Sequence, residues 1–418
     1  MKGFEYKNNT LYCEDVPLTE IADKYGTPTY IYSYHTLIDS FNQVDKAFSG
    51  IEHLICYSVK SNSNLALINA LAKEGAGADV VSVGELVRSL RACIPAEKII
   101  FAGVGKTNYE IEYALNEDVL LFNVESLPEA YLINEIAKKY DKRVRIALRV
   151  NPDVEANTHE YITTGKKENK FGINFDKAMD VIREIKGLKN LYLCGLHTHI
   201  GSQILTSEPY VDALNRLKEL KNVLDKEGLQ ITLINMGGGF GIKYRENEEP
   251  LDVDALAESI IPIVKEMGCS LLMEPGRYIS GPAGILLTKL IYFKIGSTKN
   301  FAIIDGGMSE LIRPSLYSAY HEIRNVVLNS KAHKVIADFV GPICESGDFL
   351  GKDREIPMPN QGDLYAVMNS GAYGFAMSSN YNSRCKVAEV LVKDSKCYLV
   401  KERESIEDLM KGEIIPGF

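Results

Sequence analysis

Eight short apolar runs that alternate with segments of helical periodicity constrain the fold of this chain more than any other feature of its sequence. The runs are LICYSV (54–59), GADVVSV (77–83), KIIFAGV (98–104), VLLFNV (119–124), VRIALRV (144–150), LCGLHTHI (193–200), ITLINMGG (231–238) and SLLMEPG (270–276). Helix-like stretches such as NLALINALAKEG (64–75) separate them. Apolar strands that alternate with helices are typical of a parallel sheet covered by helices. Eight units over roughly 230 residues favour a closed (β/α)₈ barrel over an open doubly wound sheet.

The pattern changes after about residue 280. From there the chain carries β-branched and aromatic runs, such as FAIIDGG (301–307) and KVAEVLVK (386–393), without regular helices between them. The N-terminal run TPTYIYSY (27–34) is strand-like too. A chain of 418 residues also favours two or three domains. We therefore predict an α/β protein with a barrel over residues 36–279 and a separate β-rich domain made of residues 1–35 and 280–418.

Composition excludes several classes of partner. A net charge of −9 argues against nucleic acid, which requires clustered Lys and Arg. The N-terminal stretch lacks the apolar core of a leader, and no window offers about 18 uncharged apolar residues, so we expect a cytoplasmic protein without a membrane partner. The cysteines form no C-x-x-C pair. This predicts reduced thiols rather than a zinc site or a disulfide framework.

Polar residues gather at the predicted carboxyl ends of the strands, where barrels of this kind carry their chemistry. They are Lys60, Asp79, Arg149, His197, His199, Gly237 to Gly239, and Glu274 to Arg277. Each one alone is readily explained as a solvated ion pair or a turn. Their convergence from six strands predicts a functional site at one mouth of the barrel. The polar segment that follows the fifth strand, residues 151–175, is too long for a tight turn and is a candidate functional loop.

Each of these residues could have more than one role. Lys60 could point into water, or it could be a partly desolvated amine that attacks a carbonyl. NMGGGFG (235–241) could form a plain turn, or it could offer backbone N–H groups to a phosphate. His197 and His199 share one face of a strand and could bind a metal, although a stacked or hydrogen-bonded histidine is favoured because no second ligand pair is recognisable.

Glu274 completes a pattern that points to one cofactor. A carboxylate beneath a heteroaromatic ring nitrogen keeps that nitrogen protonated, which makes the ring an electron sink. A lysine able to form an imine, a phosphate-binding loop and such an acid together indicate pyridoxal 5′-phosphate (PLP) and no metal.

The motifs YSVKSN, THIGSQ, GGGFG, EPGR, GPICESGD and GAYG occur in an order and at separations that resemble those of the barrel-type PLP-dependent decarboxylases. This family includes ornithine and diaminopimelate decarboxylases and is related in fold to alanine racemase. The resemblance spans nearly the whole chain and is strongest to the members that act on diaminopimelate. It implies a carboxy-lyase that converts meso-2,6-diaminopimelate into L-lysine and carbon dioxide, the last step of lysine biosynthesis.

The resemblance also implies roles for individual residues. Lys60 would hold PLP as an imine, His199 would stack on the ring, and Glu274 would face the ring nitrogen. The remaining cofactor-binding residues would be Asp79, Arg149, Ser202, Gly237, Gly238, Gly239, Gly276, Arg277 and Tyr373. In a homodimer with shared sites, the partner subunit would supply Cys344 as proton donor.

The expected substrate carries a distal carboxylate and a distal amine. The resemblance assigns the carboxylate to Arg313 and Tyr317, with Arg277 and Tyr373 as further substrate contacts, and the distal amine to Glu345. An arginine suits this role because its fork meets a carboxylate with two hydrogen bonds. Arg313 could instead cap a turn, and Cys344 could be a buried packing residue. The alternatives at the level of function are a sister decarboxylase acting on carboxynorspermidine, ornithine or arginine, a PLP-binding regulator, and a metal-dependent hydrolase that uses His197 and His199.

Overall fold

The structure is a computed structural model that describes residues 3–154, 170–329 and 331–417. Most of the loop predicted after the fifth strand, residues 155–169, lies outside the described residues. The chain divides into two compact units. The barrel unit comprises Ile38–Lys243 and Glu249–Ile279. The β unit comprises Met1–Leu37, Tyr244–Glu248 and Ser280–Phe418.

The barrel unit is built on eight parallel strands that close on themselves in the order β5-β6-β7-β8-β9-β11-β12-β13-β5. The strands are β5 (His53–Ser58), β6 (Gly77–Val80), β7 (Ile99–Phe101), β8 (Leu121–Val124), β9 (Val144–Asn151), β11 (Leu191–His197), β12 (Leu233–Asn235) and β13 (Ser270–Met273). Each falls within or overlaps one of the eight apolar runs, so the predicted barrel is confirmed. A two-residue strand, β10 (Ile173–Asn174), pairs with β9 beside the closed ring.

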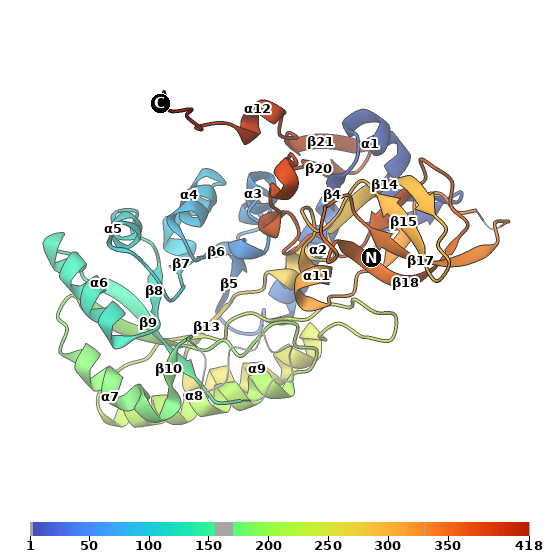
Figure 1. Cartoon of the computed structure of the whole chain (residues 1–418). Coiled ribbons are helices and arrows are strands. Elements are labelled where there is room, and N and C mark those ends of the chain that lie inside the picture. The colour runs from blue at the N-terminus through green and yellow to red at the C-terminus, as the bar shows by residue number, and fades with distance from the viewer. Residues whose placement is uncertain (1–2, 155–169, 330, 418) are drawn as a thin grey trace. The chain divides into compact units, whose positions relative to one another are not determined.

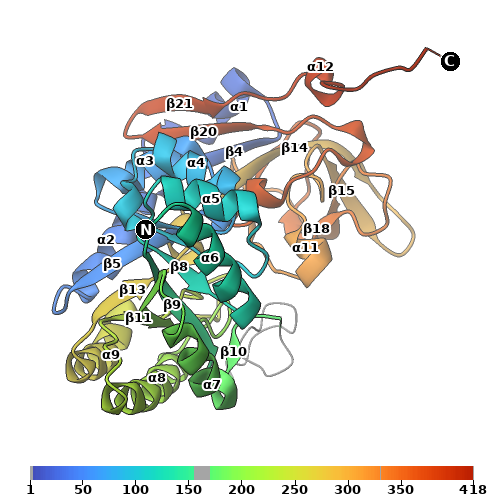
Figure 2. The same cartoon turned by 90° about the vertical axis from the view of Figure 1, so that its left-hand side faces the viewer.

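Helices lie on the outer side of the strands (Figure 1 and Figure 2). They are α2 (Tyr34–Ala47), α3 (Leu65–Lys73), α4 (Val83–Arg91), α5 (Asn108–Asn116), α6 (Leu127–Lys139), α7 (Phe175–Lys186), α8 (Glu208–Lys226) and α9 (Val253–Met267). The short helix α10 (Arg277–Ser280) follows β13. Several begin at side-chain caps in the connections that follow the strands. The side chains of Ser82, Thr107 and Ser126 accept backbone N–H groups in the first turns of α4, α5 and α6. These caps satisfy amides that a helix start leaves without partners, so each βα connection stays short.

The inside of the barrel is filled by small and branched side chains from seven of its strands. They are Cys56, Ile100, Leu121, Ala147, Cys194, Leu233 and Leu272, all of them buried. This layer makes the barrel a packed core rather than a pore, which leaves the polar residues to the strand ends.

The β unit contains a mixed sheet and a small antiparallel sheet. The mixed sheet runs in the order β18-β17-β15-β14-β4-β20-β21, with β19 pairing β14 and β16 pairing β19. Its strands are β4 (Thr29–Ser33), β14 (Gly284–Lys294), β15 (Asn300–Ile304), β16 (Ile323–Asn325), β17 (Lys334–Val340), β18 (Phe349–Pro357), β19 (Leu364–Val367), β20 (Ala388–Lys393) and β21 (Lys396–Lys401). The N-terminal strand β4 pairs antiparallel with β14 and parallel with β20, so it lies in the interior of the sheet.

The small sheet packs with α1 (Leu18–Tyr25) against the apolar side chains of the mixed sheet. Its strands are β1 (Phe4–Lys7), β2 (Thr10–Cys13) and β3 (Val16–Pro17). Two further short helices, α11 (Arg313–Tyr317) and α12 (Ile406–Leu409), follow β15 and β21. No helix in the described part of the chain is long and apolar enough to cross a membrane.

Candidate active site

Lys60 lies in a single 3₁₀ turn (Val59–Ser61) that follows β5 at the carboxyl end of the barrel. Its Nζ lies 3.0 Å from Oδ2 of Asp79, which belongs to the neighbouring strand β6. The hydroxyl of Ser58 donates to the same oxygen across 2.6 Å. The Asp79 carboxylate is completely buried, while 37% of the Lys60 side chain is exposed. Lys60 is therefore an amine held by a buried anion with one side open to solvent, not a strand end that projects into water.

Glu274 follows β13 and is held by two amides from other strands. Asn235 of β12 and Asn123 of β8 donate from Nδ2 to its Oε1 across 2.7 Å and 3.1 Å. Burial, reinforced by the negative charge of Asp79, raises the pKa of Glu274 to about 8, and the opposing effects of Lys60, the Asn235 hydrogen bond and Arg149 are smaller. A carboxyl group with such a pKa can hold or release a proton near neutral pH.

His197, the last residue of β11, and His199, two residues later, differ in their surroundings. His197 is buried, and its Nε2 lies 3.5 Å from Oε1 of Glu274. Burial and the positive charge of Arg149 lower the pKa of His197 well below its ordinary value. His199 is partly exposed, and its Nδ1 accepts the backbone N–H of Gly238 across 3.1 Å. Because an amide N–H can only donate, Nδ1 carries the lone pair and the proton of a neutral ring sits on Nε2.

The glycine run after β12 is packed closely against the neighbouring strand ends. Gly237 and Gly239 have φ values of 71° and 91°, which favour glycine. A Cβ on Gly238 would lie 2.1 Å from the carbonyl oxygen of Glu274, so a side chain would push the two strand ends apart. Nearby, Nη2 of Arg277 donates to the hydroxyl of Ser202 across 3.0 Å. The same rim thus combines backbone N–H groups, a hydroxyl and a guanidinium, which are the donors that a phosphate requires.

Arg149 forms a buried ion pair inside the barrel unit. Its Nη1 lies 3.0 Å from Oε1 of Glu125, and the other oxygen of Glu125 accepts the backbone N–H of Gly172. Next to it, Lys106 pairs with Glu129 across 2.6 Å, and Glu129 accepts the N–H of Glu125. These contacts make Arg149 part of a buried network of ion pairs and hydrogen bonds. Its contact with the cofactor remains a prediction.

Several buried polar atoms at this end of the barrel make no hydrogen bond within the described residues. They are Asp79 Oδ1, Asn123 Oδ1, Thr198 Oγ1 and both ring nitrogens of His197. Buried polar atoms are normally satisfied, and a concentration of exceptions beside Lys60 is typical of a site for a polar ligand. The protonated ring nitrogen and the hydroxyl of PLP are groups that such acceptors and donors can bind.

The other predicted site residues lie in the β unit. Arg313 is buried at the start of α11, and Tyr317 ends the same helix partly exposed. Cys344 and Glu345 are exposed in the loop before β18. Tyr373 follows β19 and has a φ of 55°. The exposure of Cys344 in this chain contradicts the alternative that it is a buried packing residue, while its role as proton donor remains a prediction.

The loop that carries Cys344 is held by polar contacts. Asp348 accepts the backbone N–H groups of Met308 and Ile343, and Asn382 accepts the N–H of Cys344 across 2.8 Å. A loop anchored at both ends can present an exposed thiol in a defined place.

Sequence reasoning missed four residues of interest. Asn123 and Asn235 interrupt apolar strand runs at their carboxyl ends, and that signal was visible in the sequence. Glu85 gave no such signal, yet burial raises its pKa to about 7 in the neighbourhood of Asp79 and Lys60. His321 is completely buried beside Arg313, and only the fold reveals this proximity.

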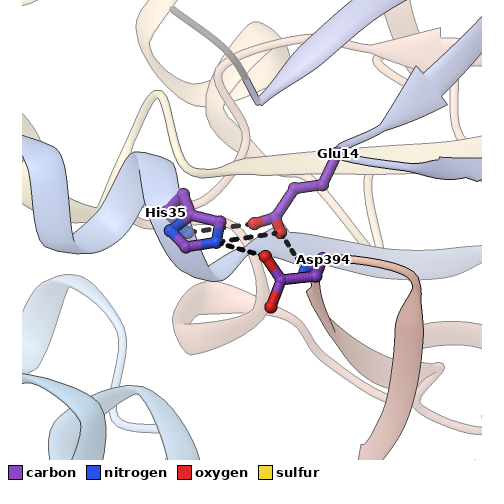
Figure 3. Close-up of side chains that lie close together, drawn as sticks. All are labelled: Glu14, His35 and Asp394. Atoms are coloured by element: carbon purple, nitrogen blue, oxygen red, sulfur yellow. Dashed lines mark hydrogen bonds and ion pairs between the residues drawn. The ribbon is translucent and has the colours of Figure 1, made fainter.

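A group of three potential metal ligands in the described residues consists of Glu14, His35 and Asp394 of the β unit (Figure 3). Nε2 of His35 lies 2.9 Å from Oδ1 of Asp394. Both oxygens of the Glu14 carboxylate accept hydrogen bonds from within the protein. The donors are the Ser33 hydroxyl and the backbone N–H groups of His35 and Asp394. The group therefore ties three chain segments together as a hydrogen-bonded cluster. His197 and His199 belong to no such group among the described residues.

Comparisons with known proteins agree with this geometry. The family described as "Pyridoxal-dependent decarboxylase, pyridoxal binding domain" matches residues 34–281. Diaminopimelate decarboxylase from Vibrio cholerae is 46% identical over 99% of this chain and 99% of its own length. The enzyme of that name from Aquifex aeolicus is 45% identical over 98% and 97%.

A solved structure extends the likeness to three dimensions. The crystal structure of diaminopimelate decarboxylase from Helicobacter pylori, complexed with L-lysine, has 39% identity and a TM-score of 0.91 over 94% of this chain and 98% of that one. The chain therefore belongs to the pyridoxal-dependent decarboxylases, within the group of the diaminopimelate decarboxylases.

Proposed function

We propose that the mouth of the barrel around Lys60, Asp79 and Glu274 is the PLP site of an enzyme that decarboxylates meso-2,6-diaminopimelate to L-lysine. The observation that carries this assignment is the grouping of an amine paired with the buried Asp79 and, on the same rim, a buried carboxyl group with a pKa of about 8. Lys60 would carry the cofactor covalently. Glu274 would face the ring nitrogen, and His199 would lie against the ring.

The phosphate of PLP would be held by the donors around the glycine run that follows β12, together with Tyr373 of the β unit. The residues proposed for it are Ser202, Gly237, Gly238, Gly239, Gly276, Arg277 and Tyr373. The hydrogen bond between Arg277 and Ser202 supports this grouping within the barrel unit, because it holds two of the donors together. PLP, when bound, supplies a conjugated ring that accepts the electron pair of the bond broken in decarboxylation.

The residues around the ring control protons. Asp79 orients the Lys60 amine, while Asn123 and Asn235 fix one oxygen of Glu274. Glu274 can then hold a proton beside the ring nitrogen with its other oxygen. Neutral His197 adds no competing positive charge, since burial lowers its pKa.

The overall reaction breaks the bond between the D-configured carbon and its carboxylate, releases carbon dioxide and places a proton on that carbon. We assign the proton to the thiol of Cys344 of a partner subunit. The exposure of Cys344 and Glu345 in an anchored loop supports this assignment. The proposal therefore includes a homodimer whose sites are shared between subunits.

Arg313 and Tyr317 are proposed to bind the distal carboxylate, and Glu345 the distal amine. Arg277 and Tyr373 are proposed as further substrate contacts. The lysine complex of the Helicobacter pylori enzyme supports an amino acid with this distal end as the ligand. We also propose a cytoplasmic location, which is supported by cysteines that are all free in the structure, as expected in a reducing compartment.

The direct test is turnover by purified protein loaded with PLP. Meso-diaminopimelate should yield carbon dioxide and L-lysine in equal amounts, whereas ornithine, arginine and carboxynorspermidine should be turned over far more slowly. Equal or faster turnover of one of these three would assign the protein to a sister activity. Cofactor binding without any turnover would instead favour a regulator.

A further inference from the structure

Ser58, the last residue of β5, lies directly opposite Asp79 of β6 in the parallel pairing of the two strands. It is 2% exposed, and its hydroxyl donates to Oδ2 of Asp79 across 2.6 Å. Its backbone is fixed on both sides, because its N–H donates to the carbonyl oxygen of Pro275 and its own carbonyl oxygen accepts the Ser61 hydroxyl across 2.8 Å. The strand pairing and these contacts hold the Ser58 side chain beside Asp79.

Asp79 receives its hydrogen bonds on one oxygen. Oδ2 accepts from the Ser58 hydroxyl and from Nζ of Lys60, whereas Oδ1 is buried and makes no hydrogen bond within the described residues. The carboxylate is completely buried, and its charge acts on its neighbours. Together with burial, it raises the pKa of Glu274 to about 8 and the pKa of Glu85 to about 7. A buried carboxylate of this kind depends on the few donors that reach it.

The proposed function weakens one of these two donors. An ammonium group has three N–H donors and a full positive charge. When the Lys60 amine condenses with the aldehyde of PLP and releases water, its nitrogen keeps at most one proton, and any remaining charge is delocalised into the conjugated cofactor. The hydrogen bond from Lys60 to Asp79 is then weakened or lost, whatever else Lys60 contacts. In the described part of the chain, Ser58 is the other side chain that donates to Asp79, and this step leaves its hydroxyl unchanged.

We propose that Ser58 is a positioning residue that stabilises and orients the buried Asp79 carboxylate after Lys60 has bound PLP, and thereby strengthens PLP binding. This inference rests on the proposed function, since it assumes that Lys60 carries PLP. Ser58 acts through Asp79 and does not have to touch the cofactor. Its hydrogen bond contributes more in the loaded protein, because the competing cation has been withdrawn from the same oxygen.

The experiment measures the dissociation constant of PLP by equilibrium dialysis of cofactor-free protein. The proteins are wild type, Ser58→Ala, Asp79→Asn, the double variant Ser58→Ala/Asp79→Asn and Lys60→Ala. Ser89→Ala is the matched control, because Ser89 is also a buried serine of the barrel unit but donates to the backbone carbonyl oxygen of Glu85.

We expect Ser58→Ala to weaken PLP binding by roughly five- to tenfold, because a buried carboxylate loses a hydrogen bond in the state that needs it most. On the Asp79→Asn background the same change should alter the affinity by less than about twofold, since no buried charge remains to be stabilised. A serine needed only for packing would cost the same affinity on both backgrounds. Ser89→Ala should match wild type.

PLP affinity in Ser58→Ala that matches wild type would overturn the inference, and so would an equal loss on both backgrounds. In either case a strong loss of affinity in Lys60→Ala leaves the proposed function intact, whereas unchanged affinity in Lys60→Ala means that the proposed function has failed. Should Ser58→Ala not fold, Ser58→Cys replaces it, because a thiol is a weaker donor than a hydroxyl. A loss in Ser58→Cys that disappears on the Asp79→Asn background supports the inference, and a loss that persists there, or no loss, contradicts it.

Discussion

Asn235 joins the acid of the site to the glycine run, because its Nδ2 donates to Glu274 across 2.7 Å and its Oδ1 accepts the N–H of Gly237 across 2.9 Å. One buried side chain thus holds the carboxyl group proposed for the ring nitrogen and the backbone proposed for the phosphate. This double role makes Asn235 a sensitive place to test the electrostatics of the barrel mouth.

Asn235→Ala should raise the pKa of Glu274 above about 8, because the amide stabilises the ionised form. A hydrogen bond to a charged group contributes roughly 1.5–3 kcal/mol, which corresponds to a rise of about one to two pH units. The measurement is a ¹³C NMR titration of labelled glutamate in cofactor-free protein. Asn190→Ala, which alters an asparagine just before β11, is the control. An unchanged Glu274 titration in Asn235→Ala would show that the amide has no electrostatic role.

The raised pKa of Glu274 also makes stability depend on pH. In the unfolded chain its pKa is near 4.5 and in the folded chain about 8, so the folded state binds more protons between these values. Stability should therefore fall as pH rises through this window. Urea unfolding of cofactor-free Glu274→Gln should match wild type near pH 5 and exceed it at pH 8.5 by a few kcal/mol, on the order that such a pKa difference implies. Parallel pH profiles for the two proteins would contradict the raised pKa.

Lys106 and Glu129 form a buried pair whose loss should be costly. Lys106 also donates to the carbonyls of Gly103 and Asn123, and its side chain is 1% exposed. Lys106→Met leaves Glu129 buried without its cation and should cost about 3–5 kcal/mol in the free energy of unfolding. Lys106→Met/Glu129→Gln should recover part of that loss, because no charge remains buried. A double variant as unstable as the single one would mean that the bonds to the two carbonyls, and not the charge pair, determine the cost.

Shared sites predict rescue between two inactive proteins. A Lys60→Ala subunit paired with a Cys344→Ala subunit has one doubly altered site and one intact site. With free exchange about half of the dimers are mixed, so activity should approach about one quarter of wild type. Tagged chains confirm the exchange, and each variant must be nearly inactive alone. Verified mixed dimers without activity would place both residues in the site of one chain.

The barrel was predictable because parallel strands buried on both faces read as continuous apolar runs, and all eight runs carry strands. The polar residues of the strand ends could be predicted too, because Asp79 and Glu274 lie within those runs and Lys60 directly follows one. Pairings between distant positions were not predictable. Asn123 and Glu274 are 151 residues apart, and nothing local to either residue specifies the other.

Buried partners of charged residues were equally hidden. Arg149 and Arg313 could be recognised as arginines at suitable positions, but Glu125 and His321 as their partners depend on tertiary packing. The exposure of Cys344 likewise follows from the anchoring of its loop by Asp348 rather than from its own sequence neighbourhood.

The central claim, that Lys60 is the residue that carries PLP, is tested most directly by trapping the cofactor on the protein. Holoprotein reduced with borohydride, digested and analysed by mass spectrometry should carry the pyridoxyl phosphate mass on the peptide that contains Lys60. Lys60→Ala should lose this label together with the visible absorption of the bound cofactor, whereas Lys98→Ala, which alters a lysine directly before β7, should keep both. Label on a different lysine of the wild type, or an unchanged absorption spectrum in Lys60→Ala, would contradict the account.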